Sequence, residues 1–198
     1  MRTCSTRAMD ARSDRIIQVA IELAERDGYD AVRMRDLAAQ ADVSLATVYR
    51  RFSCKEDILA AALDQHVALL SVLLRSAAIP GATGPERLNA FFDLATRGLA
   101  ERPKLAAAML RTVASGVPEL AERVTRYHGR MTESILAVYR GGFTDVPASE
   151  AEAVLVQLLQ SVWLAGLVGW TGGLHGPEVV IDQVRTATRL LMAGLEAS

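Results

Sequence analysis

The sequence predicts an all-α protein with about nine helices, arranged as a small N-terminal unit followed by a larger helical body. Apolar residues recur at helical spacing, and no alternating apolar run with a hairpin turn interrupts them. Pro and Gly gather in short clusters between the periodic segments, and Ala, Leu, Val and Arg dominate the composition. A chain of 198 residues can bury one large core or two small ones.

Three helices account for the N-terminal unit, residues 12–57. The first is predicted from Ser13 to Asp27, and Gly28 suits the left-handed conformation that ends many helices. Two short amphipathic segments follow between residues 34 and 52, joined by a tight turn over residues 41–43. The second segment opens at Ser44, a favourable N-cap residue. Two short helices joined in this way are typical of a helix-turn-helix.

A long fourth helix, rather than a flexible linker, joins this unit to the body, residues 58–198. Ser53 and Glu56 have the spacing of a capping box at its start, and its apolar stripe continues to about Ala78. A Pro- and Gly-rich break follows over residues 80–85. The remaining helices are predicted over residues 86–100, 104–114, 119–139, 149–170 and 178–196.

Polar and cationic side chains gather at one end of the predicted helix-turn-helix. The first 55 residues carry more Lys and Arg than Asp and Glu, whereas the rest of the chain carries fewer. The residues expected on this exposed end are Ser44, Thr47, Tyr49, Arg50, Arg51 and Lys55. An ordinary helical hairpin inside a bundle is the alternative, but such a hairpin would mix carboxylates into this surface. The pattern therefore favours DNA as the partner.

Residues 15–59 resemble the N-terminal domain of the TetR family of bacterial repressors. The matching segments are Gly28-Tyr29, Arg35-Asp-Leu-Ala38, Val43-Ser44, Thr47-Val-Tyr49, Phe52 and Lys55-Glu56. The resemblance implies that Ser44, Tyr49 and Lys55 hold phosphates. It also implies that base edges in the major groove are contacted by Arg35, Leu45, Ala46, Thr47 and Arg51.

Three departures from the family pattern concern the DNA contacts. Val32 and Arg33 stand where family members usually have Thr or Ser, so the second helix lacks a hydroxyl N-cap and has a cation, Arg33, there instead. Leu45 and Ala46 replace residues that are often Lys or Arg and Gly, and both can contact a thymine methyl group.

The last two helices are apolar enough to supply a dimer contact. Residues 153–170 are apolar around nearly the whole helix, and such a helix must be covered on every side. The final helix has one apolar stripe, made of Val180, Val184, Ala187, Leu191 and Leu195. An internal core helix explains the pattern equally well. TetR-like proteins dimerise through these two helices, and a dimer can read two halves of a palindromic operator about 34 Å apart.

The middle helices carry residues suited to a pocket for a bulky apolar ligand. The ligand-binding candidates are His66, Phe92, Met109, Tyr127, Met131 and Trp163. Residues 28–35 and the segment Val162-Trp-Leu164 with Trp170 resemble actinobacterial repressors of sterol and lipid catabolism, which implies a steroid or an acyl-CoA thioester as inducer. Ligand binding is expected to displace the fourth helix and release the operator.

Other classes of protein find little support in the sequence. Phosphate-binding Gly-rich motifs and nucleophile elbows are absent, so an enzyme is not expected. The three His residues are scattered, so neither a metal site nor a cofactor is expected. Cys4 and Cys54 are widely spaced, which predicts no disulfide and is typical of a reduced cytoplasmic protein. Residues 153–170 contain Gln157 and Gln160, which favours a buried helix over a membrane span. The competing function is a helical scaffold that binds only protein.

Overall fold

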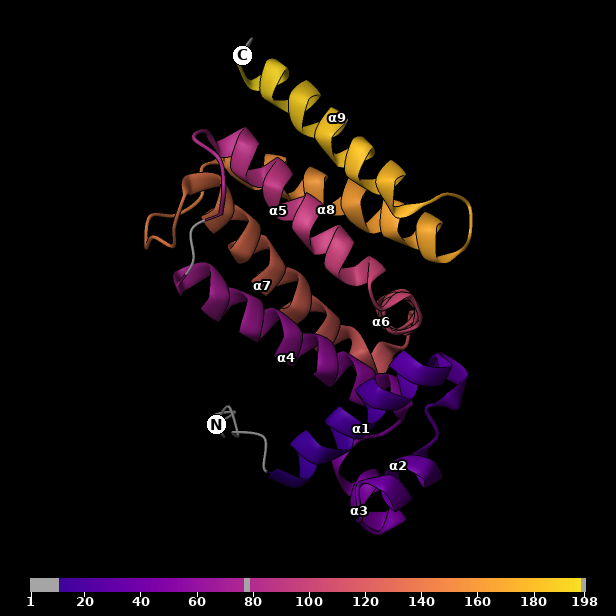
Figure 1. The fold of residues 1–198 in the computed structure, drawn as a ribbon. Helices are drawn as coiled ribbons and strands as arrows, with labels where there is room; N and C mark the ends of the chain where they lie inside the picture. The colour runs from indigo at the N-terminus through magenta and orange to yellow at the C-terminus, as the bar shows by residue number, and fades with distance from the viewer. Residues whose placement is uncertain (1–10, 77–78, 197–198) are drawn as a thin grey trace.

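The computed structural model describes residues 11–76 and 79–196, with side chains as far as Gly194. Within these ranges the chain forms nine α-helices and two 3₁₀ turns and contains no strand (Figure 1). The prediction of an all-α fold is therefore confirmed. Cys4, the end of the long helix predicted at Ala78 and the side chain of Leu195 lie outside the described residues.

The N-terminal unit contains α1 (Ala11–Asp27), the 3₁₀ turn η1 (Tyr29–Ala31), α2 (Met34–Gln40) and α3 (Leu45–Arg51). Gly28 follows α1 with φ 87° and ψ −177°, so it is not in the left-handed helical conformation predicted for it, although glycine also enters this region at little cost. Between α2 and α3, Asp42 has a φ of 53°, and the amide of Val43 donates to the carbonyl of Ala38 at 3.0 Å. This turn connects α2 to α3 through four residues, 41–44, and completes the predicted helix-turn-helix.

The body contains six further α-helices and a second 3₁₀ turn. Their bounds are α4 (Lys55–Ser76), α5 (Gly84–Ala100), α6 (Pro103–Val113), η2 (Pro118–Leu120), α7 (Ala121–Arg140), α8 (Glu150–Thr171) and α9 (Pro177–Glu196). Capping boxes open α5, through Thr83 and Glu86, and α8, through Ser149 and Glu152.

The capping box predicted at the start of α4 is wrong. The backbone amide of Ser53 donates to the carboxylate of Asp57 at 3.0 Å, so Asp57 takes the place expected of Glu56. Glu56 instead accepts a hydrogen bond from the hydroxyl of Tyr29, which lies 27 positions earlier in the chain. A contact at that sequence separation is invisible to a local capping pattern.

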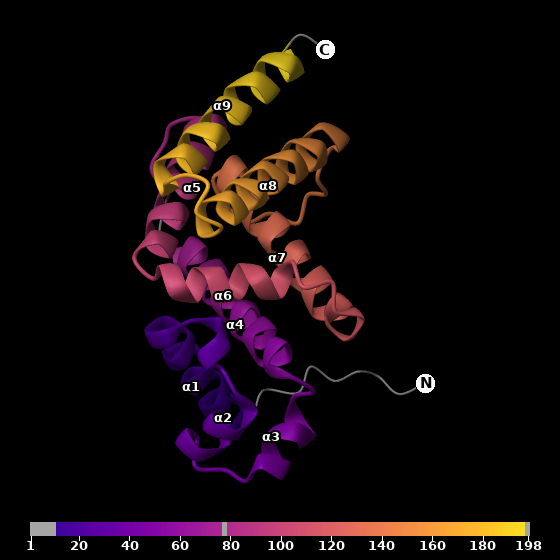
Figure 2. The ribbon, with the colours of Figure 1, turned by 90° about the vertical axis from the view of Figure 1, so that its right-hand side faces the viewer.

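Two apolar cores hold the molecule together, and α4 contributes to both. The first core gathers α1, α2, α3 and the beginning of α4 around buried residues such as Ile16, Leu37 and Ile58. The second gathers α5, α7, α8 and α9 around residues such as Phe92 and Leu159. Helix α6 lies between the N-terminal helices and the rest of the body (Figure 2) and adds Leu105, Ala108 and Met109 to the first core.

Helices α8 and α9 pack against each other at the end of the molecule opposite α3 (Figure 2). The sequence assigned the apolar stripe of α9 to a dimer contact, but Val180 and Val184 are buried within the same chain, and Ala187 and Leu191 pack against the second core. Two described helices, α4 and α8, are long and apolar enough to cross a membrane by length and composition. Both contribute buried residues to the second core.

Candidate nucleic-acid interface and interior of the body

Helix α3 lies at one end of the molecule, with its apolar side held on the first core (Figure 1). Val48 and Phe52 are buried, whereas Ala46, Tyr49 and Arg50 are exposed. The helix begins as predicted: the Ser44 hydroxyl accepts a hydrogen bond from the amide of Thr47 at 3.1 Å. The exposed side of α3 is therefore free to enter a groove while its other side is fixed by packing.

Three of the arginines predicted to contact DNA lie on the surface of the N-terminal unit. Arg33 and Arg35, at the start of α2, are exposed like Arg50. Arg33 is the N-cap residue of α2 and makes no side-chain capping bond, as the missing hydroxyl predicted. Among the described residues, no carboxylate forms an ion pair with Arg33, Arg35 or Arg50. Cations without an internal partner remain available to phosphates or base edges.

Two of the predicted DNA contacts are engaged inside the protein. Arg51 is half-buried and donates a hydrogen bond to the hydroxyl of Ser13 on α1 at 3.2 Å, so its guanidinium lies on the supporting helix. Lys55 is half-buried as well; its Nζ donates to the carbonyl of Tyr29 at 3.2 Å and lies 3.8 Å from the centroid of the Tyr29 ring. Leu45 and Thr47 are half-buried at the first turn of α3.

The six predicted ligand-binding residues are divided between the two cores and the surface. Phe92, Met131 and Trp163 belong to the second core, where the Phe92 and Trp163 ring centroids are 5.4 Å apart. Met109 belongs to the first core, Tyr127 packs against both cores, and His66 is exposed. Apolar residue types cannot distinguish a filled core from a cavity wall.

A polar group interrupts the apolar interface between α7 and α8. Gln160 is only 8 % exposed, accepts a hydrogen bond from the Thr132 hydroxyl at 2.9 Å, and its amide nitrogen lies 2.8 Å from Nδ1 of His128. Burial lowers the pKa of His128, which favours the neutral ring. The sequence signalled this group only through the two glutamines inside an apolar helix. Hydrogen-bonding groups of this kind orient ligands inside apolar sites.

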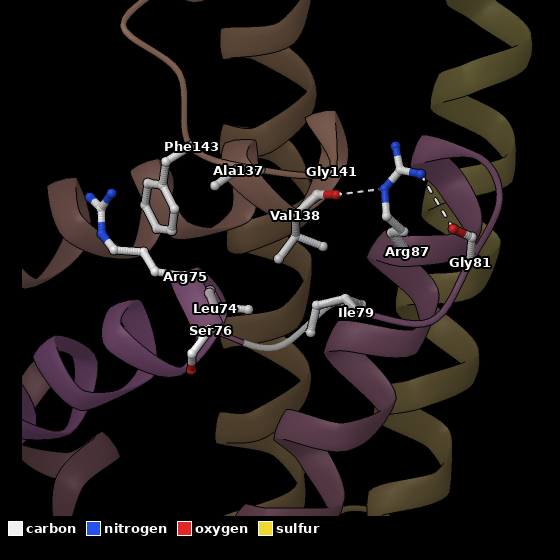
Figure 3. A pocket seen from close by; sticks show the side chains of 11 residues that line it. Leu74, Arg75, Ser76, Ile79, Gly81, Arg87, Ala137, Val138, Gly141 and Phe143 are labelled. Carbon is white, nitrogen blue, oxygen red and sulfur yellow. Dashed lines mark hydrogen bonds between the residues drawn. The ribbon is translucent and has the colours of Figure 1, made fainter.

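A depression of about 640 Å³ opens far from α3, between the ends of α4 and α7 and the beginning of α5 (Figure 3). None of the predicted ligand residues lines it. Arg75 lies with its guanidinium carbon 3.9 Å from the centroid of the Phe143 ring. Arg87 donates to the carbonyls of Val138 and Tyr139 at 3.0 and 2.7 Å and thereby caps the end of α7. The sequence signalled this region only as Pro- and Gly-rich breaks.

Two family models match the chain. The model described as bacterial regulatory proteins of the tetR family matches residues 16–62, and the tetracyclin repressor-like C-terminal domain matches residues 81–191. The HTH-type transcriptional repressor KstR of Mycolicibacterium smegmatis is 29 % identical over 185 residues, which cover 93 % of this chain and 89 % of the relative.

Solved structures share the fold. A TetR transcriptional regulator from Rhodococcus sp. RHA1 superimposes with a TM-score of 0.82 at 24 % identity, covering 93 % of this chain and 97 % of that one. FadR of Thermus thermophilus, a repressor solved in complex with lauroyl-CoA, gives a TM-score of 0.71 at 19 % identity, with coverages of 91 % and 93 %. With both halves matched by family models and the helix-turn-helix in place, the chain belongs to the TetR family of bacterial regulatory proteins.

Proposed function

We propose that two copies of this TetR-family repressor pair through α8 and α9, bind a palindromic operator with α3 in the major groove, and leave the DNA when a bulky apolar ligand enters the body. The observation that carries the pairing is a row of apolar side chains exposed on both helices. Val154, Leu158, Val168, Val179 and Leu190 are between 40 % and 62 % exposed in the single chain.

The spacing of the exposed residues supports a helix-to-helix contact. On α8 one set of exposed positions is separated by alternating steps of four and three residues: Val154, Leu158, Ser161, Ala165 and Val168. On α9 the same steps connect Val179, Gln183, Thr186, Leu190 and Ala193. Alternating steps of four and three place side chains along one seam of a helical bundle. A four-helix contact between two copies would cover both rows.

The exposed end of the helix-turn-helix supports the DNA contacts. We assign Ser44, Tyr49 and Lys55 to phosphates and Arg33 to the same backbone. Base edges are assigned to Arg35, Leu45, Ala46, Thr47 and Arg50. In this assignment Arg35 reads guanine, and the two apolar side chains contact thymine methyl groups. Arg51 keeps a supporting role, because it already donates to Ser13.

A lipid-like inducer is supported by the interior of the body and by one relative. Methionine and aromatic side chains such as Met131, Phe92 and Trp163 can rearrange around an apolar guest, and Gln160 with His128 offers polar contacts. FadR of Thermus thermophilus binds lauroyl-CoA. We therefore propose an acyl-CoA thioester as inducer, with a steroid as the second candidate from the sequence resemblance. To change the DNA-competent fraction from 99 % to 1 %, the ligand must favour the other state by about 5.5 kcal/mol.

The pairing is tested by analytical ultracentrifugation of the full chain and of Leu190→Glu. The wild type should sediment as a dimer and the variant as a folded monomer with much weaker operator binding. Leu94→Glu is the matched control, since Leu94 is 56 % exposed on α5, outside the proposed seam. A wild-type monomer that binds operator fully would contradict the pairing.

DNA and ligand binding are tested by fluorescence anisotropy with duplexes from the region upstream of the coding sequence. Affinity should fall steeply with salt and be highest for one palindromic duplex. Lauroyl-CoA should release that duplex, whereas coenzyme A without an acyl chain should not. Salt-independent or absent DNA binding would instead favour a protein-binding scaffold.

A further inference from the structure

Helix α6, which belongs to the body, is fastened to the N-terminal unit by three cations. Arg102 pairs with Glu25 at 3.4 Å, and Nζ of Lys104 donates to the carbonyl of Arg26 at 2.7 Å. These contacts lie at the end of α1, where the helix dipole and the unpaired carbonyls attract positive charge. Two turns further along α6, the third cation, Arg111, reaches η1.

The aromatic ring of Tyr29 forms cation–π contacts with Arg111 of α6 and with Lys55 at the start of α4. The guanidinium carbon of Arg111 lies 4.1 Å from the ring centroid, and the Arg111 guanidinium also pairs with Asp30 at 3.7 Å. Lys55, at the first turn of α4, lies 3.8 Å from the same centroid. An aromatic face attracts cations through its quadrupole, so a single ring joins α6 to the beginning of α4.

Further bonds fix Tyr29 against the beginning of α4. Its hydroxyl donates to the carboxylate of Glu56, and its carbonyl accepts from Nζ of Lys55 at 3.2 Å. Burial, followed by the bond to Glu56, raises the pKa of Tyr29 to about 12, so the hydroxyl keeps its proton at any working pH. Although burial opposes it, the bond from Tyr29 contributes to lowering the pKa of Glu56, which keeps the acceptor ionised. The position of the Lys55 ammonium therefore depends on where Tyr29 is held.

We propose that Tyr29 is a positioning residue for DNA binding, through which Arg111 of α6 sets the ammonium group of Lys55 against its phosphate. The proposal rests on the DNA contact assigned to Lys55 above. It gives the body a second connection to the DNA-binding unit besides the continuous helix α4. A shift of α6 pulls on Tyr29 and moves a phosphate-binding group directly.

A double-mutant cycle on operator affinity tests this connection. Arg111→Ala should weaken operator binding about two- to fivefold, the range expected for one exposed cation–π contact. In the Lys55→Ala background the same substitution should change affinity by less than about 1.5-fold, because the group it positions is gone. Equal effects in the two backgrounds would overturn the proposal.

The salt dependence separates positioning from direct contact. Lys55→Ala should reduce the slope of log affinity against log salt by about 0.9, the value for one lost phosphate contact, whereas Arg111→Ala should leave it unchanged. A reduced slope in Arg111→Ala would show that Arg111 itself binds DNA and would overturn the proposal. Arg97→Ala is the matched control, because Arg97 is an exposed body arginine that pairs with Asp93 and Glu178. If Arg97→Ala weakened operator binding as much as Arg111→Ala, the effect of Arg111→Ala would be explained by the loss of positive charge alone.

Substitutions at Tyr29 test the ring. Tyr29→Phe keeps the aromatic face and should retain the coupling between Arg111 and Lys55, whereas Tyr29→Leu should abolish it with the protein still folded by circular dichroism. If Tyr29→Leu does not fold, amide hydrogen exchange of the Arg111→Ala variant in the absence of DNA provides the test. Exchange should be faster than in the wild type at residues 29–32 and 55–58, and unchanged exchange would overturn the proposal. A wild type that binds no duplex refutes the proposed function, whereas a wild type that binds with an additive cycle refutes only the role of Tyr29.

Discussion

Replacing Arg51 by alanine separates a supporting arginine from a base-reading one. The Arg51 guanidinium donates to the Ser13 hydroxyl at 3.2 Å from a half-buried position. A hydrogen bond from a charged donor contributes about 1.5–3 kcal/mol, and partial exposure and the long bond reduce this to about 1–2 kcal/mol. Because 1 kcal/mol shifts the melting temperature of a chain of this size by about 2–4 °C, we expect Arg51→Ala to melt about 2–8 °C lower.

Thermal unfolding by circular dichroism measures this loss, and Arg50→Ala is the neighbouring control with the same change of charge. Arg50 is exposed and has no ion-pair partner among the described residues, so its removal should alter stability by less than about 0.5 kcal/mol while weakening DNA binding. Well below its melting temperature, Arg51→Ala should keep the wild-type ratio of operator to scrambled-duplex affinity. A tenfold loss of that ratio with unchanged melting would refute the reasoning and return Arg51 to the major groove.

Three further predictions concern separate parts of the molecule. Arg35→Ala should lose about 1–3 kcal/mol of DNA-binding free energy at one cognate base pair and relax specificity there. Fluorescence anisotropy with single-base operator variants measures this loss, and equal weakening of binding to random DNA would exclude base reading by Arg35. Trp163→Phe removes the 2.9 Å hydrogen bond from Nε1 to the Thr96 hydroxyl and should lower the free energy of unfolding by about 1–3 kcal/mol. Urea unfolding measures this loss, and an unchanged midpoint would show that the bond does not contribute to stability. The hydrogen bond from Arg140 lowers the pKa of Glu152 from its ordinary 4.5 to about 2. The ion pair therefore stabilises the fold above pH 4.5, and this stabilisation is lost as the pH falls toward 2. Glu152→Gln should flatten the acid-unfolding profile between these pH values.

Local sequence patterns predicted the helices and the recognition helix because their causes are local. Ser44 caps α3 through a residue three positions away, and the buried Val48 follows from helical spacing. The beginning of α4 was mispredicted because the partner of Glu56 is Tyr29, in a different element.

The dimer face and the ligand pocket depend on information that periodicity does not contain. An amphipathic stripe shows that one side of α9 is covered but not by which chain, and the stripe with Val180 proved to be internal. The proposed seam lies on the adjoining face of α9, one residue before most positions of the stripe, where Leu190 alternates with polar residues such as Thr186. In the same way, the ligand-binding candidates Phe92 and Trp163 pack in the second core with their ring centroids 5.4 Å apart, and their residue types alone do not distinguish a filled core from one that opens for a ligand.

The participation of α6 in the first core has a consequence for building hybrid regulators. A chimaera could join the DNA-binding unit of another repressor to this body at the start of α4. In it, Leu105, Ala108 and Met109 of α6 would face side chains of the other repressor. Such a graft would leave voids or collisions where the two parts meet and would respond poorly to its inducer. A chimaera that transfers the DNA-binding unit together with the α6 residues that contact it should preserve this packing.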